Sequence, residues 1–285
     1  MFTDDAVTPI RLEILVDLLR AYPAGLARKD VSRLLQPKSL EPDPKLAPAT
    51  ATIKAGLELR LIEEVGGKLS LSDSNRKDST ARDAILGAFD EFVFCSVEVE
   101  KYFALFYAYY LGLGKLAYGM QNRSREAWAI EFNRVVFDDV PQVNRFNEPK
   151  YKGLDAWFDY VGLGWFDPAG VFQANPYGRL LRAFPKIFSK SRKLSSEDFM
   201  KKLSEACPEL DGGEIFRQAN RDWKITDKNC SLGLSHALIE LHEDEIVRLD
   251  CPADAQGWSL KEADPPRDGD SFKDDRFVSV EWRKK

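Results

Sequence analysis

The feature that most restricts the fold of this chain is the pattern of its first 80 residues, in which apolar repeats alternate with proline and glycine breaks. Thr8 and Pro9 precede the first apolar run, and a hydroxyl cap followed by proline at the first helical position indicates a helix start. Two shorter apolar runs follow, and Gly66-Gly67 then separates two short segments. The pattern predicts helices at about 9–21, 27–36 and 48–61 and a hairpin at 62–71.

Three helices followed by a hairpin is the order of a winged helix-turn-helix. The chain between the second and third helices holds Pro37, Pro42, Pro44 and Pro48, so we expect a rigid, non-helical connection at 37–48. The polar, turn-rich residues 72–82 then mark a surface linker and a module boundary.

The rest of the chain predicts a helical region and a second module of the same kind. Aromatic residues crowd into residues 83–164, which favours two to four helices around a large core, and a small hairpin is expected around 167–170. This hairpin is either a separate turn or the wing of a module built on the middle helices. Helices at 176–188, after Ser195 and at 231–243 are followed by strands at 246–249 and 277–282, with a long acidic wing loop at 252–275.

We therefore predict a mostly α (α+β) protein with two winged helix-turn-helix modules joined by an aromatic-rich helical region. The expected domains are an N-terminal winged helix at 1–75, a helical middle region at 83–172, and a C-terminal winged-helix-like domain at 173–285. A chain of 285 residues is long enough for two or three packed units.

Composition and cysteine spacing predict a cytoplasmic protein. No apolar run approaches the roughly 20 residues that span a bilayer, and residues 1–5 lack the basic start of a signal peptide. The four cysteines are far apart and form no C-x-x-C pair, so reduced and mostly buried thiols are expected in place of a zinc site: Cys95, Cys207, Cys230 and Cys251.

Charge is segregated along the chain although the net charge is only −5. Residues 179–202 hold eight basic residues against Glu197 and Asp198. Basic residues three or four apart share one face of a helix, and such a face is either solvated or in contact with phosphate. The nucleic-acid-binding candidates are Lys54, on the third helix of the first module, and six residues of the basic segment: Arg179, Arg182, Lys186, Lys190, Arg192 and Lys193.

The predicted recognition helices are poorly suited to reading base edges. Direct readout needs Arg, Lys, Asn or Gln side chains. The third helix of the first module offers Ala51, Lys54, Ala55 and Glu58, and that of the second offers His236, Ile239, Glu240 and Glu243. Small side chains favour packing against a protein, and the two carboxylates would repel phosphate.

No catalytic, cofactor or metal motif is evident, so we predict that the protein is not an enzyme and binds no cofactor. His236 and His242 are six residues apart and do not share a helical face, and no phosphate-binding loop occurs. Glu98-Val99-Glu100-Lys101 contains an E-x-K fragment, as in some nucleases, but without the preceding aspartate on a strand. The histidines are expected to be structural.

Several segments resemble the DpdG-like proteins of bacterial islands for DNA modification and phage defence. The resemblance covers about residues 8–250 and rests on the N-terminal module together with segments at 144–151, 154–157, 160–165, 199–208, 210–213 and 231–238. It implies an accessory role in a multiprotein antiviral defence system and carries no active site.

These inferences favour a non-enzymatic adaptor or scaffold subunit that binds partner proteins, such as an ATPase, helicase or nuclease, with DNA backbone as a second contact. Self-association is compatible with the sequence, and a membrane is not an expected partner. Two alternatives stay open, a winged-helix transcriptional regulator and a kite-like subunit of an SMC-type complex.

Overall fold

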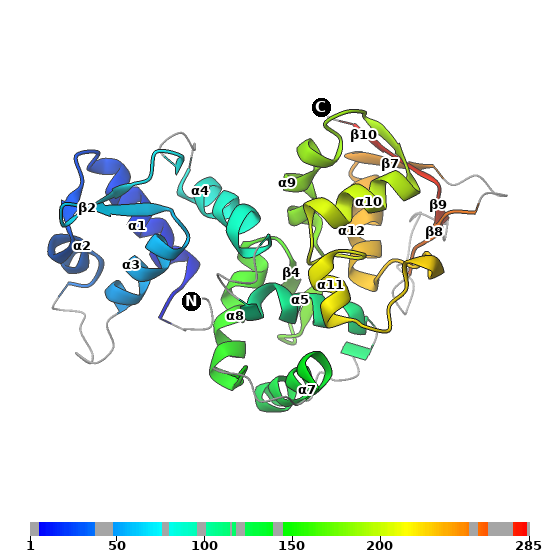
Figure 1. The fold of residues 1–285 in the computed structure, drawn as a ribbon, viewed down its shortest axis with the longest axis horizontal. Helices are drawn as coiled ribbons and strands as arrows, with labels where there is room; N and C mark the ends of the chain where they lie inside the picture. The colour runs from blue at the N-terminus through cyan, green and yellow to red at the C-terminus, as the bar shows by residue number, and fades with distance from the viewer. Residues whose placement is uncertain are drawn as a thin grey trace. The chain divides into compact units, whose positions relative to one another are not determined.

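The computed structural model describes residues 6–37, 48–75, 80–95, 101–114, 116–117, 123–138, 145–250, 256–261 and 276–283. The chain forms two compact units (Figure 1), one from residues 1–103 and 146–160 and the other from 104–145 and 161–285. The boundary thus falls inside helix α5 (Lys101–Leu113), and the predicted middle region 83–172 is divided between the units.

Unit 1 begins with the helices and hairpin that the sequence predicts. Helix α1 (Pro9–Ala21) is capped by Thr8, whose hydroxyl accepts a hydrogen bond from the Arg11 amide. Helices α2 (Arg28–Leu35) and α3 (Pro48–Glu58) follow, and the hairpin pairs β2 (Ile62–Val65) with β3 (Lys68–Leu71). Gly66 and Gly67 have φ angles of 60° and 76°, a left-handed conformation that favours glycine in a tight hairpin turn.

Two details of this module differ from the prediction. Strand β1 (Leu26–Ala27) was not predicted, and it pairs with β3 to give a three-stranded sheet in the order β1-β3-β2. The third helix ends three residues earlier than expected, because Arg60 adopts a positive φ of 54°. Most of the proline-rich connection, 38–47, lies outside the described residues.

The remainder of unit 1 packs on α1. Helix α4 (Ala81–Ala88) continues into a π-helical turn, η3 (Phe89–Val93), and helix α8 is Glu148–Tyr160. The Trp157 indole nitrogen of α8 donates to the Val7 carbonyl at 3.1 Å, and the Tyr160 hydroxyl donates to Glu13 Oε1 at 2.7 Å. The expected linker is not wholly a linker, since Asn75 is buried and donates to the Arg60 carbonyl.

The C-terminal part of unit 2 follows the element order of the first module, with two short helices as unpredicted additions before the last helix. Helix α9 (Tyr177–Ile187) is followed by β6 (Lys193–Ser195), α10 (Ser196–Ala206), α11 (Glu214–Ala219), the short 3-10 helix η4 (Ile225–Asp227), α12 (Leu232–Glu243), β7 (Val247–Asp250) and β10 (Ser279–Trp282). The sheet order β6-β10-β7 matches β1-β3-β2, because the strand between the first two helices again pairs with the last strand.

Short elements modify the predicted wing of unit 2. Strand β8 (Trp258–Ser259) lies within the expected loop 252–275 and pairs with β9 (Arg276–Phe277), and the return strand is interrupted at Val278. Residues 251–255 and 262–275 lie outside the described residues. Helix α7 (Arg125–Phe137) and the hairpin of β4 (Gly164–Phe166) and β5 (Phe172–Ala174) complete this unit, and the hairpin turns where the sequence predicts it.

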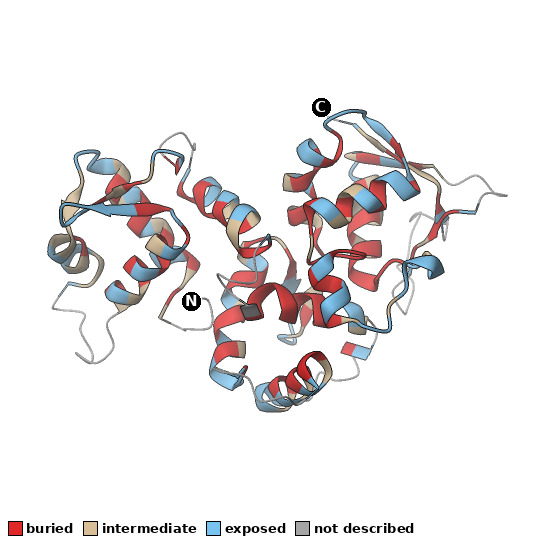
Figure 2. Cartoon of the chain, in the orientation of Figure 1, coloured by how far each residue is buried: buried red, intermediate tan, exposed pale blue. Residues whose placement is uncertain are grey.

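Aromatic side chains form much of the core. Every residue of α5 from Tyr102 to Leu111 is buried, as Figure 2 shows along this helix. A helix buried on every face belongs to the interior of a protein and offers no stacking surface to a ligand. The aromatic residues of this helix therefore pack the core, and none of the described helices is long and apolar enough to cross a lipid bilayer.

Candidate nucleic-acid interface

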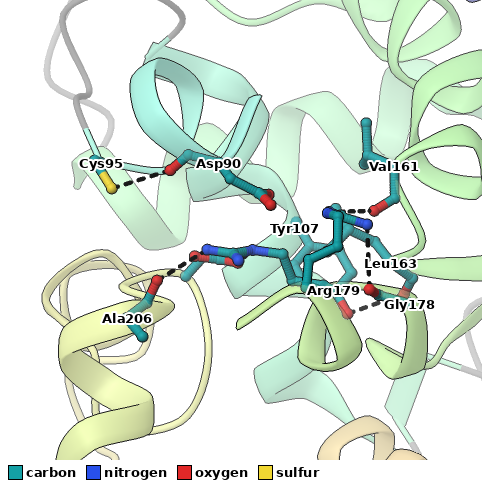
Figure 3. Close-up of polar contacts among 10 residues, drawn as sticks. Asp90, Cys95, Tyr107, Val161, Leu163, Gly178, Arg179 and Ala206 are labelled. Atoms are coloured by element: carbon teal, nitrogen blue, oxygen red, sulfur yellow. Dashed lines mark hydrogen bonds and ion pairs between the residues drawn. The ribbon is translucent and has the colours of Figure 1, made fainter. Parts of the chain in front are cut away.

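Arg179 does not lie on the surface, contrary to the prediction that it belongs to a basic face. Its side chain is only 2% exposed, and its Nε donates to Glu209 Oε1 at 2.8 Å while Nη2 donates to the Ala206 carbonyl at 3.0 Å (Figure 3). The Glu209 side chain is 0% exposed, and a carboxylate in that position requires a counter-charge. The guanidinium supplies it and cannot reach a phosphate from there.

Arg182 is half-buried and also binds within the unit. Its Nη2 donates to the Val161 carbonyl at 2.8 Å and its Nη1 to the Gly178 carbonyl at 3.2 Å (Figure 3). The first bond joins α9 to the segment that precedes β4, and the second lies within α9. Arg182 therefore holds two segments of unit 2 together, and it is only partly exposed.

The expectation that the basic residues of 179–202 share one face of a helix is wrong. Helix α9 ends at Ile187, and Lys190 and Arg192 lie in the connection to β6, where Lys193 is the first residue. Lys193 Nζ binds Asp250 Oδ2 at 2.6 Å, and Arg248 Nε binds Asp250 Oδ1 at 2.9 Å. Because Asp250 serves two cations, Lys193 stabilises the sheet of unit 2.

Three of the predicted cations remain exposed and form no ion pair with the described residues: Lys186, Lys190 and Arg192. The seventh candidate, Lys54, is exposed on α3, where its Nζ lies 3.6 Å from Glu58 Oε1. An exposed pair at this spacing contributes about 0.3–0.5 kcal/mol, so it orders the two side chains only weakly. Ala55, expected on the same open face, is buried, and Thr50 is exposed there instead.

The third helix of the second module, α12, is covered by other parts of unit 2. A Cβ on Gly233 would meet Leu111 Cδ1 at 2.6 Å and the Ala174 carbonyl oxygen at 2.7 Å, so α5 and β5 contact this helix directly. Asn175 Nδ2 donates to Glu240 Oε2 at 2.6 Å. His236, Ile239 and Glu240 are only half-exposed, and the face predicted to be open is closed except near Glu243.

Sequence reasoning missed a group of buried polar side chains at the N-terminus of α12. Asp211 accepts hydrogen bonds from the Ser231 amide and, at 2.7 Å, from the Ser231 hydroxyl, which itself caps α12. Burial raises the pKa of Asp211 to about 6, and the two bonds from Ser231 oppose that shift. Nearby, the Tyr107 hydroxyl donates to the Leu163 carbonyl at 2.9 Å (Figure 3), and burial raises its pKa.

These buried groups explain part of the sequence pattern. Segments 160–165, 208–213 and 231–238 meet around α9 and α12, because the Gly162 carbonyl accepts from the Arg179 amide and Asp211 reaches Ser231. The sequence contained one signal for this buried group, because Glu209 and Asp211 alternate with Pro208, Leu210 and Gly212. All these groups are inaccessible, so they stabilise the unit and do not form a binding site.

The described residues contain no group of three or more acidic, histidine or cysteine side chains that could hold a metal ion. Cys207 and Cys230 are buried as expected, whereas Cys95 is exposed and donates to the Asp90 carbonyl at 3.2 Å (Figure 3), and Cys251 lies outside the described residues. His242 Nδ1 accepts from the Leu249 amide at 3.1 Å, which gives this histidine the structural role that the sequence predicts. Burial lowers its pKa.

The fold and these surfaces define a mostly helical protein of two units, each with a three-stranded antiparallel sheet, in which most of the candidate cations do not form an open basic face. A model of the DpdG-like family matches residues 2–255. The chain therefore belongs to the DpdG-like family, as its sequence segments suggested. No curated protein and no solved structure matches it. The family suggests a role in a DNA-modification or defence-related system, in association with other proteins of that system.

Proposed function

We propose that both units are built on winged helices and that the protein is a non-enzymatic adaptor of a bacterial anti-phage defence or DNA-modification complex. The repeated element order supports the first part, since each module adds its first strand to the last strand of the hairpin. Membership in the DpdG-like family supports the second part.

The observation that carries the adaptor role is the covered position of α12. In a winged helix that reads DNA, the third helix enters the major groove and needs an open face. Here α5, β5 and Asn175 occupy that face from within the same unit. The second module therefore uses its third helix for internal packing and has no free helix with which to read bases.

The third helix of unit 1 is open, but its side chains suit a protein partner better than base edges. Its exposed line consists of Thr50, Lys54 and Glu58, which carry one positive and one negative charge. The hairpin beside it adds Val65, which is 69% exposed, next to two glycines. A charge-balanced line with an apolar tip matches the mixed character of protein interfaces. We assign this face to a partner protein of the same system, in the class of an ATPase, helicase or nuclease.

Copurification with the products of neighbouring genes tests the proposal. The exchange Lys54→Glu with Glu58→Lys keeps the net charge and the intrahelical pair, but it reverses the charges that a partner meets. We expect this variant to lose a partner that the wild-type protein retains in size-exclusion chromatography with light scattering. The matched control is Glu131→Arg with Arg134→Glu, which reverses an exposed pair on α7.

Three outcomes would contradict the adaptor role. The first is a wild-type protein that runs alone with every neighbouring gene product. The second is protection of one specific operator in a footprint that depends on Lys54, which identifies a transcriptional regulator. The third is cleavage of a plasmid with Mg²⁺ or Mn²⁺. A dimer that binds an SMC-type ATPase would support the adaptor role in its kite-like form.

A further inference from the structure

The C-terminal end of helix α9 gathers four cations from α9, the connection to β6 and α10. Lys186 lies in the last turn of α9, and Lys190 and Arg192 follow in the connection to β6. The Lys202 ammonium lies at the same helix end, because its Nζ donates to the Ile187 carbonyl at 3.3 Å. The connection is tied to β10, because the Trp282 amide donates to the Arg192 carbonyl at 2.7 Å. We call these residues, Lys186, Lys190, Arg192 and Lys202, the α9-end cluster.

The cluster differs from the other basic residues nearby because carboxylates do not neutralise it. Lys193 and Arg248 share Asp250, and Lys228 binds Glu197 Oε1 at 2.8 Å. Lys186, Lys190 and Arg192 form no ion pair with the described residues. In the sheet, Glu281 has Lys193 and Arg248 as its register partners. The local charge is thus positive although the chain as a whole is acidic.

A rigid aromatic base supports the connection that carries Lys190 and Arg192. The ring of Phe188 lies 5.5 Å from that of Phe184 and 5.8 Å from that of Trp282. The strand register also fixes where the cluster lies, since Lys193 pairs with Glu281 and Ser195 with Ser279. The wing connection joins Asp250 to Ser279, so the cluster lies at the opposite end of the sheet from the wing.

We propose that the α9-end cluster binds the phosphate backbone of nucleic acid without reading its sequence. Residues 182–193 include no exposed large apolar side chain, whereas a protein interface usually has apolar or aromatic residues at its centre. Exposed Ser189 and Ser191 lie between the cations, and hydroxyls together with Lys and Arg are the groups that contact phosphate. The inference rests on the proposed adaptor function and deepens it: the adaptor would bind the DNA of the defence system through a surface separate from the one that binds the partner protein.

Fluorescence anisotropy with a random-sequence 30-base-pair duplex, titrated at several salt concentrations, tests the site. The variant Lys186→Gln, Lys190→Gln, Arg192→Gln removes three cations, and the control Lys201→Gln, Arg217→Gln, Lys224→Gln removes three other exposed cations of the same unit. Each lost phosphate contact lowers the slope of log K against log salt by about 0.9. We expect the cluster variant to bind about tenfold more weakly at low salt, with a slope smaller by about 2 to 3, and the control to bind as the wild type does.

The proposal is overturned if the wild-type protein does not bind the duplex at 50 mM salt, if the cluster variant keeps the wild-type slope, or if both variants lose affinity equally. Loss of a protein partner in the cluster variant, with duplex binding intact, would assign the cluster to an acidic protein instead. Circular dichroism of each variant serves as the control for folding. Failure of the adaptor function is distinguishable, because it shows in the copurification with partner proteins and leaves the anisotropy unchanged.

Discussion

At the scale of single residues, side-chain burial decides the role of each charge in this protein. Arg179 belongs to a run of basic residues in the sequence, yet it lies in the core because Glu209 lies there too. Lys186, only seven residues later, is exposed. The two residues have the same charge and lie on the same helix, so periodicity alone could not separate them.

The buried Arg179–Glu209 pair gives the first prediction. Glu209→Gln leaves the guanidinium buried without a counter-charge, so we expect the free energy of unfolding to fall by about 3–5 kcal/mol. The double variant Arg179→Met, Glu209→Gln removes both charges and should recover most of that loss. Urea unfolding of the wild type, both single variants and the double variant measures the coupling. Additive effects of the two substitutions would contradict the pairing.

Asp211 gives a prediction about pH. Its pKa is raised from 3.8 to about 6 in the folded protein. Between these values the folded state holds a proton that the unfolded state has released, so the free energy of unfolding decreases as pH rises through this window. The contribution is on the order of 3 kcal/mol. In Asp211→Asn, which retains an acceptor for the Ser231 amide, this decrease should be absent. Denaturant unfolding at pH 4, 5, 6 and 7 measures the difference between the two proteins, and parallel curves would refute it.

At the scale of elements, local signals set where helices begin and end. Thr8, Ser195 and Ser231 each accept a hydrogen bond from the amide three residues later, and the sequence predicted this role for Thr8 and Ser195. The sequence did not predict strands β1 and β6, because strands of two or three residues are too short to show an alternating pattern. Each strand forms by pairing with the free edge of a longer strand, β3 or β10. The sequence also did not predict that α12 is covered, because an amphipathic pattern does not tell which segment packs against the polar face of a helix.

The closed face of α12 predicts opposite results at two helical glycines. Gly233→Ala would bring a Cβ within 2.7 Å of the Ala174 carbonyl oxygen, so we expect a loss of about 1–3 kcal/mol in the free energy of unfolding. Gly87→Ala on α4 meets nothing within 4 Å and should stabilise by about 0.5–1 kcal/mol, because alanine favours a helix. Thermal and urea unfolding measure both, and a stable Gly233→Ala protein would show that α12 is more open than the structure indicates.

At the scale of the whole molecule, the division into units differs from the one that composition suggests. The aromatic region 83–172 looks like a domain of its own in sequence, but its helices complete the cores of both units. Helix α8 belongs to unit 1 although some 60 residues separate it from α4, since Trp157 and Tyr160 bind residues at the start of the chain. Only long-range contacts define such a unit.

This division predicts how a local defect spreads. Trp157→Phe removes the donor to the buried Val7 carbonyl, at a cost of about 1–3 kcal/mol. We expect faster amide hydrogen exchange in residues 9–21 and 148–160 and unchanged exchange in residues 177–206, because the two units have separate cores. If residues 1–75 formed an independent domain, α1 would keep its protection, and that result would rule out unit 1 as described.

The sequence by itself determined where most of the helices and the hairpin turns lie, since caps, prolines, hairpin glycines and apolar repeats act on neighbouring residues. It also indicated the DpdG-like family through its short segments. The tertiary structure alone decided which surfaces are available. Arg179 turned inward to Glu209, α12 was covered by α5 and β5, and the cations at the end of α9 stayed in solvent. Whether a side chain is buried depends on segments far away in the chain, and the local pattern of apolar and polar residues does not identify those segments.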